Sequence, residues 1–308
     1  MEKMEIKMQE LKKQLYSKNI NVIENAPMSQ YTSFKAGGEA KMLVIVETVE
    51  ELKEVLQTVA DSQIKSMMLG NGSNTLFKDS GYDGVVIKLG DGFAEVSVNE
   101  ETATVEAGAS ILLSVLAKQI LAASLAGFEF ASGIPGSLGG ALFMNAGAYG
   151  GEMKDIVQYV RAVSTDGKEE RVFTAEEMEF AYRHSALEEN HYIAVSAVMQ
   201  LKKGDKDAIA AEMKELMEKR NSKQPVAYPS AGSTFKRPEG YFAGKLIQDA
   251  GLKGVSVGGA EVSTLHSGFI INKGGATATD IINLIHLVQN TVYDKYGVKL
   301  EPEVRIIG

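Results

Sequence analysis

The sequence predicts an α+β fold built from two regions. Short runs rich in β-branched residues recur at close intervals up to about Leu201, and helical patterns separate only some of them. This mixture of strand pairs with βα units favours the α+β class over a doubly wound parallel sheet. From about Asp205 the pattern changes to a charged amphipathic segment and then a compact helix–strand–helix region. We therefore expect a boundary between the two regions near 200–225.

The first predicted elements are a charged helix and a strand followed by a helix. Residues 1–17 carry charges throughout and predict a surface helix. The β-branched run 41–46 predicts a strand, and it leads into Thr48 and Glu51 at the spacing of a capping box. Apolar residues at helical spacing follow, so a helix is expected to begin at Thr48.

The later elements follow in the same way from periodicity and turn residues. They are strands over 64–69, 84–89, 94–98 and 102–107, a buried helix over 109–127 ended by Gly127, strands over 155–165 and 191–201 with a short helix opened by Thr174 and Glu177 between them, a connecting helix over 205–222, a helix over 241–250, a strand over 268–272, a long helix over 279–296 and a closing strand over 298–308.

Composition excludes several classes of function. The chain of 308 residues has a net charge of −8, whereas a nucleic-acid-binding protein needs a basic face. It has no cysteine, so disulfides, thiolate metal sites and cysteine nucleophiles are excluded, and we expect no metal centre. The charged N-terminus does not resemble a signal peptide, and no run of about 18 apolar residues predicts membrane insertion. We expect a cytoplasmic protein.

Two glycine-rich segments are candidates for holding a cofactor. The first is GNGSN, which comprises Gly70, Asn71, Gly72, Ser73 and Asn74 and follows a predicted strand. Its glycines allow close backbone approach, and its amide and hydroxyl groups can donate hydrogen bonds to phosphate oxygens. Thr75 stands where the dinucleotide fingerprint needs a third glycine, so that motif is absent. An ordinary turn remains the alternative for this segment alone.

The second segment, GIPGSLGGALFMNAGAYGGE over 133–152, is more specific. Small residues remove side-chain bulk from a long stretch of backbone, which suits packing against a flat ring system and a diphosphate. Tight packing of a helix on its neighbour is the alternative. The candidate cofactor-binding residues in this segment are Gly133, Ile134, Pro135, Gly136, Ser137, Asn145, Gly147, Ala148 and Tyr149.

These two segments, together with AYRHS over 181–185, PSAGSTFKRP over 229–238 and LEPEVRIIG over 300–308, give the chain a family resemblance. In their order and spacing they resemble the UDP-N-acetylenolpyruvoylglucosamine reductase family, from about Thr32 to Gly308. The first two motifs are shared with a wider group of FAD-linked oxidases, and the last three mark this reductase. The chain resembles the shorter branch of the family, because no insertion that would carry a substrate-covering tyrosine follows Arg183.

The resemblance implies a fold and a domain organisation. It implies a two-part FAD-binding region of the FAD-linked oxidase type and a smaller C-terminal α+β substrate domain. The boundaries expected are an N-terminal helical extension over 1–30, the FAD-binding region over 31–204, the substrate domain over 205–297 and a returning C-terminal strand over 298–308.

The resemblance also implies a reaction. NADPH, the co-substrate, passes hydride to non-covalently bound FAD, and reduced flavin then passes hydride to the vinyl carbon of an enolpyruvyl UDP-sugar in peptidoglycan precursor synthesis. No protein partner is implied. Ser233 matches the proton donor, Arg183 the cation that stabilises the developing enolate, and Glu303 the catalytic glutamate. Because these residues come from both halves of the chain, we expect a cleft between domains.

Several further residues are candidates for binding the substrate. They are Tyr182, Lys223, Lys236, Lys245 and His266. Solvated surface positions remain the alternative for the lysines, and a structural role remains the alternative for the histidine. Many family members have asparagine after the lysine of the serine loop, whereas this chain has Arg237, so any contact made by that asparagine is in doubt here.

Two other functions remain open at the level of sequence. The first is another FAD-linked oxidase or dehydrogenase acting on a hydroxy acid or alcohol. Such enzymes often tether flavin through cysteine or histidine, and neither residue occurs in the cofactor segments. The second is a flavin-binding protein without catalysis. The presence of Arg183, Ser233 and Glu303 together counts against that reading.

Overall fold

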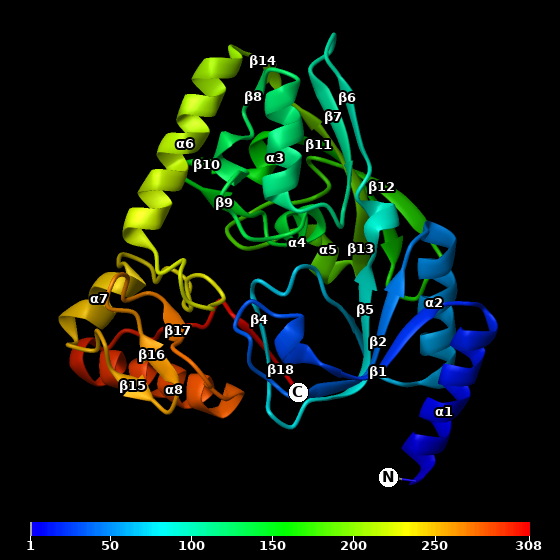
Figure 1. The fold of residues 1–308 in the computed structure, drawn as a ribbon, viewed down its shortest axis with the longest axis horizontal. Coiled ribbons are helices and arrows are strands. Elements are labelled where there is room, and N and C mark those ends of the chain that lie inside the picture. The colour runs from blue at the N-terminus through cyan, green and yellow to red at the C-terminus, as the bar shows by residue number, and fades with distance from the viewer. Residues whose placement is uncertain (1) are drawn as a thin grey trace. The chain divides into compact units, whose positions relative to one another are not determined.

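The computed structural model describes residues 2–308, with side chains from Glu5 onward (Figure 1). Contacts divide the chain into two compact units. Unit 1 comprises residues 1–23, 42–71 and 84–218, and unit 2 comprises residues 24–41, 72–83 and 219–308. The chain therefore passes between the units several times.

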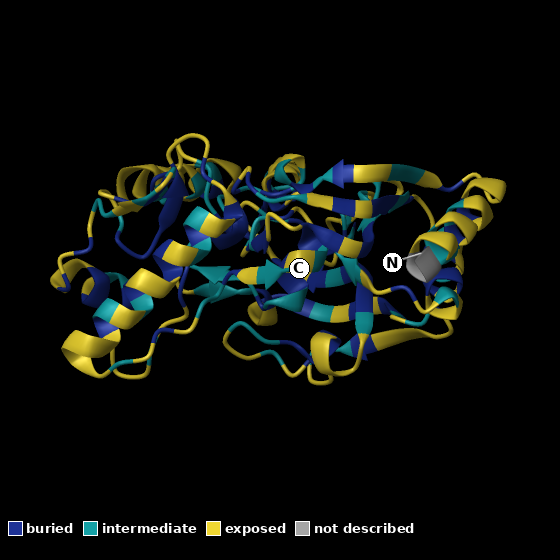
Figure 2. Cartoon of the chain, turned by 90° about the horizontal axis from the view of Figure 1, so that it is seen from below, coloured by how far each residue is buried: buried dark blue, intermediate teal, exposed yellow. Residues whose placement is uncertain are grey.

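A five-stranded antiparallel sheet forms the centre of unit 1. Its order is β12-β11-β13-β7-β6, with bounds β12 Glu170–Thr174, β11 Val157–Ser164, β13 Tyr192–Gln200, β7 Thr104–Gly108 and β6 Val96–Asn99. One face of these strands is apolar and packs with helix α3 (Leu113–Ala122) in a core that includes Val105, Leu116 and Val160. The alternation of buried and exposed residues along strands and helices is visible in Figure 2.

A second sheet has the order β1-β2-β5-β3. Its strands are β1 Asn21–Pro27, β2 Glu39–Val46, β5 Tyr82–Leu89 and β3 Ser66–Met68, and β3 runs parallel to β5. Helix α2 (Val49–Ser62) begins as predicted, because the Thr48 side chain accepts a hydrogen bond of 3.1 Å from the Glu51 amide. Helix α1 (Glu2–Ser17) is not merely a surface helix, since Leu11 and Leu15 are buried in the same core as Val44.

Unit 2 contains a small antiparallel sheet that shares a core with two helices. The strands β15 (Ser256–Val257), β16 (Ala260–Val262) and β17 (Ile270–Asn272) form an antiparallel sheet. The helices α7 (Ala243–Asp249) and α8 (Ala278–Tyr296) share a core with this sheet, to which Ile247, Ile281 and Leu284 contribute. The strands β4 (Thr75–Phe77) and β18 (Arg305–Ile307) pair in parallel. Helix α6 (Lys206–Lys223) carries the chain from unit 1 into unit 2.

The remaining elements are short. They are β8 Leu125–Ala126, α4 Leu138–Phe143, β9 Gly147–Ala148, β10 Gly151–Glu152, α5 Ala186–Glu189, β14 Lys202–Lys203 and the single 3₁₀ turns Met28–Gln30, Asp91–Phe93, Glu129–Ala131 and Met153–Asp155. Among the described helices, none combines the length and the apolar character needed to cross a membrane.

Three predicted elements differ from the structure. The helix expected to continue to Gly127 ends at Ala122, because Leu125–Ala126 instead pair with Lys202–Lys203 as strands β8 and β14. The closing strand is confined to β18, and the chain before it is irregular apart from a bridge between Phe235 and Pro302.

The helix expected at Thr174 is only a turn. Its two capping hydrogen bonds do form: the Glu177 amide donates to the Thr174 hydroxyl at 3.3 Å, and the Thr174 amide donates to the Glu177 carboxylate at 2.9 Å. The chain then leaves helical geometry at Glu179, whose φ is +47°. A cap starts a helix but cannot prolong it without a buried apolar stripe.

Candidate active site

The GNGSN loop is held in place by close backbone approach. A Cβ atom on Gly70 would lie 3.0 Å from the Ser137 hydroxyl, so this glycine allows the two cofactor segments of unit 1 to touch. Gly72 has a φ of +64°, and a Cβ there would lie 2.0 Å from the Tyr31 carbonyl oxygen. Gly72 therefore requires glycine for both space and backbone conformation, whereas a side chain at Gly70 would press on the Ser137 hydroxyl.

Lys88 on β5 supports this loop and was missed by sequence reasoning. Its ammonium group donates a hydrogen bond to the Gly70 carbonyl oxygen. Burial lowers the pKa of Lys88. The sequence feature that could have identified Lys88 is its position inside the apolar run GVVIKL, because a half-buried cation in such a run needs a hydrogen-bond partner. It places positive charge next to the loop.

The segment 133–139 runs beside the start of α3. The Leu113 amide donates to the Gly136 carbonyl at 3.0 Å, and the Gly139 amide donates to the Ala109 carbonyl at 2.7 Å. The hydroxyl of Ser110 lies between these two contacts along the chain, and it is buried without a hydrogen-bond partner among the described residues. A buried hydroxyl of this kind needs a partner, so the segment suits a polar ligand group.

Asn145 ties three segments of unit 1 together. Its side-chain amide donates to the Glu152 carboxylate at 2.8 Å and to the Ala181 carbonyl at 3.1 Å, and its oxygen accepts from the Lys154 amide at 3.0 Å. The residue is 1% exposed. Its side chain is thus engaged inside the protein, which favours a positioning role over direct contact with a cofactor.

The neighbouring residues form the β9–β10 hairpin and its turn. Gly147 and Ala148 pair with Glu152 and Gly151 in antiparallel register. Tyr149, in the turn, is 47% exposed and has a φ of +53°. Of the candidate cofactor residues here, only Tyr149 presents a large side chain to solvent.

Arg183 lies in a tight turn beside Asn145. The backbones of Ala181 and His184 exchange two hydrogen bonds of 3.2 Å, and Arg183 between them has a φ of +55°. Its guanidinium lies 5.0 Å from the centre of the Tyr182 ring, which is 54% exposed. The hydrogen bond from Lys154 lowers the pKa of Glu152, and Asn145 and the charge of Arg183 lower it further against the opposing effect of burial.

Ser233 and Glu303 are brought together in unit 2. The Glu303 amide donates to the Thr234 carbonyl at 2.8 Å, so the two predicted residues stand on adjacent stretches of backbone. Thr234 is 1% exposed, its amide donates to the Gly268 carbonyl at 2.8 Å, and its hydroxyl accepts from the Ile270 amide at 3.0 Å. Thr234 was missed by sequence reasoning, although it immediately follows the serine.

Asn74 joins the same group. Its side-chain amide donates to the Glu303 carbonyl at 3.0 Å, and its own carbonyl accepts from the Arg305 amide at 3.0 Å. The parallel pairing of β4 with β18 continues this contact. The last residue of the GNGSN loop therefore helps to fix the backbone of the predicted catalytic glutamate.

The candidate substrate residues of unit 2 differ in their surroundings. His266 is half-buried, and its Nδ1 accepts a hydrogen bond of 3.1 Å from the Gly268 amide, which places it near Thr234. Lys245 pairs with Asp249 at 2.7 Å, and Lys236 pairs with Glu301 at 3.5 Å. Lys223 lies exposed at the end of α6.

Comparison with known proteins decides the family. A model for an FAD-binding domain matches residues 40–172, and one for UDP-N-acetylenolpyruvoylglucosamine reductase, C-terminal domain, matches residues 224–307. The UDP-N-acetylenolpyruvoylglucosamine reductase of Alkaliphilus oremlandii is 53% identical over 287 residues, which cover 93% of both chains. The chain belongs to the UDP-N-acetylenolpyruvoylglucosamine reductase family.

Other members of the family agree. The protein of that name from Clostridioides difficile is 51% identical over 284 residues, 92% of both chains. The crystal structure of the reductase from Thermus caldophilus has a TM-score of 0.78 and 34% identity, and it covers 94% of this chain and 99% of its own. The predictions of the family, of an FAD-linked fold with a C-terminal α+β domain and of an FAD-dependent oxidoreductase are confirmed.

The residues present fit FAD. The match to an FAD-binding domain spans the GNGSN loop and the 133–152 segment. Both segments offer backbone with little side-chain bulk, and the unpartnered Ser110 hydroxyl and the Lys88 ammonium add polar groups beside them. These are the features expected where a diphosphate and a flat ring are held.

Proposed function

We propose that this chain reduces the enolpyruvyl group of UDP-N-acetylenolpyruvoylglucosamine to UDP-N-acetylmuramate, using NADPH and bound FAD. The relatives that share about half of its residues over nearly their whole length are named for this reductase activity. The single observation that carries the proposal is the hydrogen bond joining Thr234 to Glu303, because it places the serine loop beside the glutamate strand. We expect the reaction in the cytoplasm, as a step of peptidoglycan precursor synthesis.

The two glycine-rich segments are the proposed cofactor site. FAD, when bound, accepts hydride from NADPH and supplies it to the substrate. The backbone of Gly70 and Gly136 would approach the cofactor, and Lys88 and Ser110 would meet its polar groups. The proposed binding set also includes the predicted residues Asn71, Gly72, Ser73, Asn74, Gly133, Ile134, Pro135, Ser137, Gly147, Ala148 and Tyr149.

Ser233 is the proposed proton donor. Once hydride has reached the terminal vinyl carbon, negative charge develops on the carbon beside the carboxylate, and that carbon must receive a proton. A serine hydroxyl is a weak acid, but it suffices for a strongly basic enolate held within reach. The Ser233 hydroxyl makes no hydrogen bond to the described residues, and Gly232 before it has open space around it. It is therefore available to a substrate.

Arg183 and Glu303 are the other two proposed catalytic residues. Arg183 carries a permanent positive charge, which would stabilise the enolate as the charge develops. Its turn is closed by the hydrogen bonds between Ala181 and His184, and Asn145 donates to the Ala181 carbonyl. Glu303 would assist protonation or orient a water molecule, and Asn74 and Thr234 fix its backbone.

The proposed substrate contacts are Tyr182, Lys223, Lys236, Lys245 and His266. Support is strongest for His266, whose loop pairs with Thr234 through Gly268, and for Tyr182, which stacks with Arg183. The three lysines would supply positive charge for the diphosphate of a UDP-sugar. Lys236 and Lys245 already pair with carboxylates, so they would have to exchange partners to do so.

The test is NADPH oxidation measured with and without the enolpyruvyl UDP-sugar. NADPH should bleach the flavin colour of the purified protein under anaerobic conditions, and the enolpyruvyl nucleotide should restore it with formation of UDP-N-acetylmuramate. Bleaching by a hydroxy acid or alcohol would instead support another FAD-linked dehydrogenase. A protein that neither holds FAD nor oxidises NADPH would overturn the proposal.

A further inference from the structure

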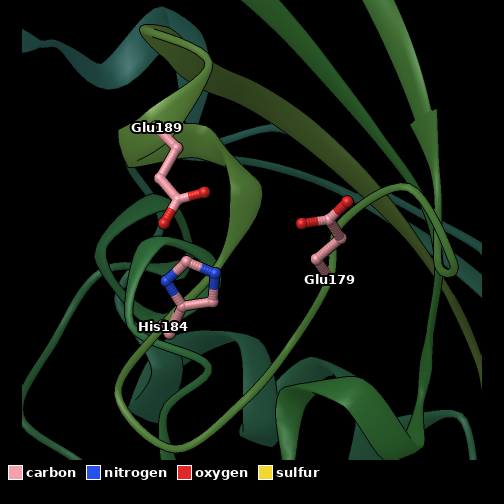
Figure 3. Close-up of side chains that lie close together, drawn as sticks. All are labelled: Glu179, His184 and Glu189. Carbon is pink, nitrogen blue, oxygen red and sulfur yellow. The ribbon is translucent and has the colours of Figure 1, made fainter.

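Three metal-binding side chains converge beside the Arg183 turn. They belong to Glu179, His184 and Glu189, and each offers one ligand atom within 4.8 Å of the other two. Figure 3 shows both carboxylates and the imidazole ring pointing toward one another. All three residues belong to unit 1, and the proposed reaction uses none of them.

The backbone brings these residues together through buried contacts. The Ala186 amide donates to the Met178 carbonyl at 2.8 Å, and this bond closes the loop from which Glu179 and His184 project. Met178 and Ala186 are 0% and 1% exposed. The Ser185 hydroxyl donates to the Phe143 carbonyl at 2.8 Å and anchors the start of α5, which carries Glu189. The three positions are therefore fixed even though the side chains reach the surface.

The cluster places two carboxylates and one imidazole close together at the surface of the protein. Glu179 and Glu189 are exposed and His184 is half-buried. Their side chains form no ion pair or hydrogen bond with any other residue in the described part of the chain. Two carboxylates this close repel each other unless a cation lies between them.

We propose that Glu179, His184 and Glu189 bind one divalent transition-metal ion of the Zn²⁺ type. One imidazole nitrogen with two carboxylate oxygens is a donor set that suits zinc, cobalt or nickel, whereas Mg²⁺ and Ca²⁺ prefer oxygen ligands alone. Tetrahedral zinc separates its nitrogen and oxygen donors by about 3.3 Å, so small rotations of the two exposed glutamates complete the site. Water would take the remaining position.

Such an ion would restrain the turn that holds Tyr182 and Arg183. Glu179 precedes these residues and His184 and Glu189 follow them, so one ion would bridge the two ends of the turn. Metal binding would then slow the opening of the hydrogen bonds between Ala181 and His184. This proposal stands apart from the proposed reaction, and either can fail without the other.

The experiment is a calorimetric titration in which Zn²⁺ is added to the FAD-containing protein in a non-coordinating buffer. The protein is free of affinity tags and has been treated with a chelator. We expect one site, at least tenfold weaker in His184→Gln and in the double variant Glu179→Gln/Glu189→Gln. Glu176→Gln and His191→Gln are matched controls, because these exposed residues lie outside the cluster and should leave the affinity unchanged. Flavin content and circular dichroism would show that each variant folds.

A second measurement separates a built site from general acidic attraction. Zn²⁺ should slow amide hydrogen exchange over residues 179–190 in the wild type but not in His184→Gln. Millimolar Mg²⁺ should neither bind with comparable heat nor slow that exchange. Equal Zn²⁺ affinity in the wild type and His184→Gln, or equal binding of Mg²⁺ and Zn²⁺, would overturn the proposal.

Discussion

The Ser233 hydroxyl is available to a ligand because the neighbouring residue, Thr234, makes the local hydrogen bonds. Thr234 makes the local hydrogen bonds through its amide, carbonyl and hydroxyl, and it is buried. Ser233 is thereby held by the backbone without using its own hydroxyl. A residue placed in this way can donate a proton to a ligand without first breaking a bond within the protein.

The first prediction concerns that hydroxyl. Ser233→Ala should reduce the rate of flavin reoxidation by the enolpyruvyl substrate by about 10²–10⁴-fold, because the enolate loses its proton donor. Ser233→Cys should retain more activity than Ser233→Ala, since a thiol can still donate a proton. Stopped-flow spectroscopy of the two half-reactions measures this, with flavin reduction by NADPH as the internal control. An unchanged second half-reaction in Ser233→Ala would exclude this role.

Asn145 gives a second prediction. Asn145→Ala should lower the free energy of unfolding by about 1–3 kcal/mol, because it removes the three hydrogen bonds that this buried side chain makes with Glu152, Ala181 and Lys154 and leaves the Lys154 amide without its partner. It should also lower kcat through displacement of Arg183. Asn190→Ala, at an exposed asparagine of the same unit, is the control. Denaturation midpoints and steady-state kinetics test both effects, and a stable variant with normal kcat would contradict the positioning role.

His266 gives a prediction about pH. Burial lowers the pKa of His266, and the charge of Lys253 adds to this effect. His266 therefore takes up a proton at higher pH in the unfolded chain than in the folded protein. Its neutral form contributes to the free energy of unfolding above the ordinary histidine pKa, and this contribution is lost as the pH falls below that value. The melting temperature of His266→Gln should fall less between pH 7.5 and 5.5 than that of the wild type. His286→Gln, an exposed histidine of the same unit, should behave like the wild type.

At the scale of elements, α8 depends on a residue far away in sequence. Asp79 accepts hydrogen bonds of 2.8 Å from the Ala278 and Thr279 amides and of 2.6 Å from the Thr279 hydroxyl. The capping box of Thr277 and Asp280 completes the helix start. Burial raises the pKa of Asp79, but these hydrogen bonds outweigh it, so the pKa lies below its ordinary value.

Asp79→Asn should therefore destabilise the protein by about 1 kcal/mol near neutral pH. A carboxylate with a lowered pKa contributes its stability above its unfolded pKa and loses it as pH falls. The difference between Asp79→Asn and the wild type should thus shrink below pH 4. Urea denaturation at pH 7 and at acidic pH measures this. Asp83→Asn, which is exposed in the same unit, should show little effect at either pH.

Two threonines show that a capping signal predicts a helix only when buried apolar residues follow it at helical spacing. Thr48 and Thr174 carry the same capping signal, yet only Thr48 begins a helix. The difference lies in the residues that follow. After Thr48 comes an apolar stripe that includes Leu52 and Val55, which are fully buried, whereas after Thr174 only Met178 is buried before the chain turns. Helices of this length need tertiary packing as well as a cap.

At the scale of the whole molecule, the cofactor should contribute to stability. FAD bound without a covalent link should be released by heat or acid, and its removal should lower the melting temperature. Free FAD at a hundred times its Kd should raise the free energy of unfolding of the apoprotein by about 2.7 kcal/mol. Differential scanning fluorimetry of the apoprotein with added FAD tests this, with riboflavin as a control that lacks the diphosphate. A melting temperature indifferent to FAD would contradict the proposed cofactor loops.

The order of amino acids was enough to indicate the family, the fold class and most helices and strands, because motifs and periodicity are local properties of the chain. It also indicated Ser233, Arg183 and Glu303, through motifs that can be read without coordinates. The contacts of Asn74 with Glu303, of Lys88 with Gly70 and of Asp79 with α8 required the folded chain. Each joins residues that no local pattern relates, since folding alone decides which distant backbone groups need a partner.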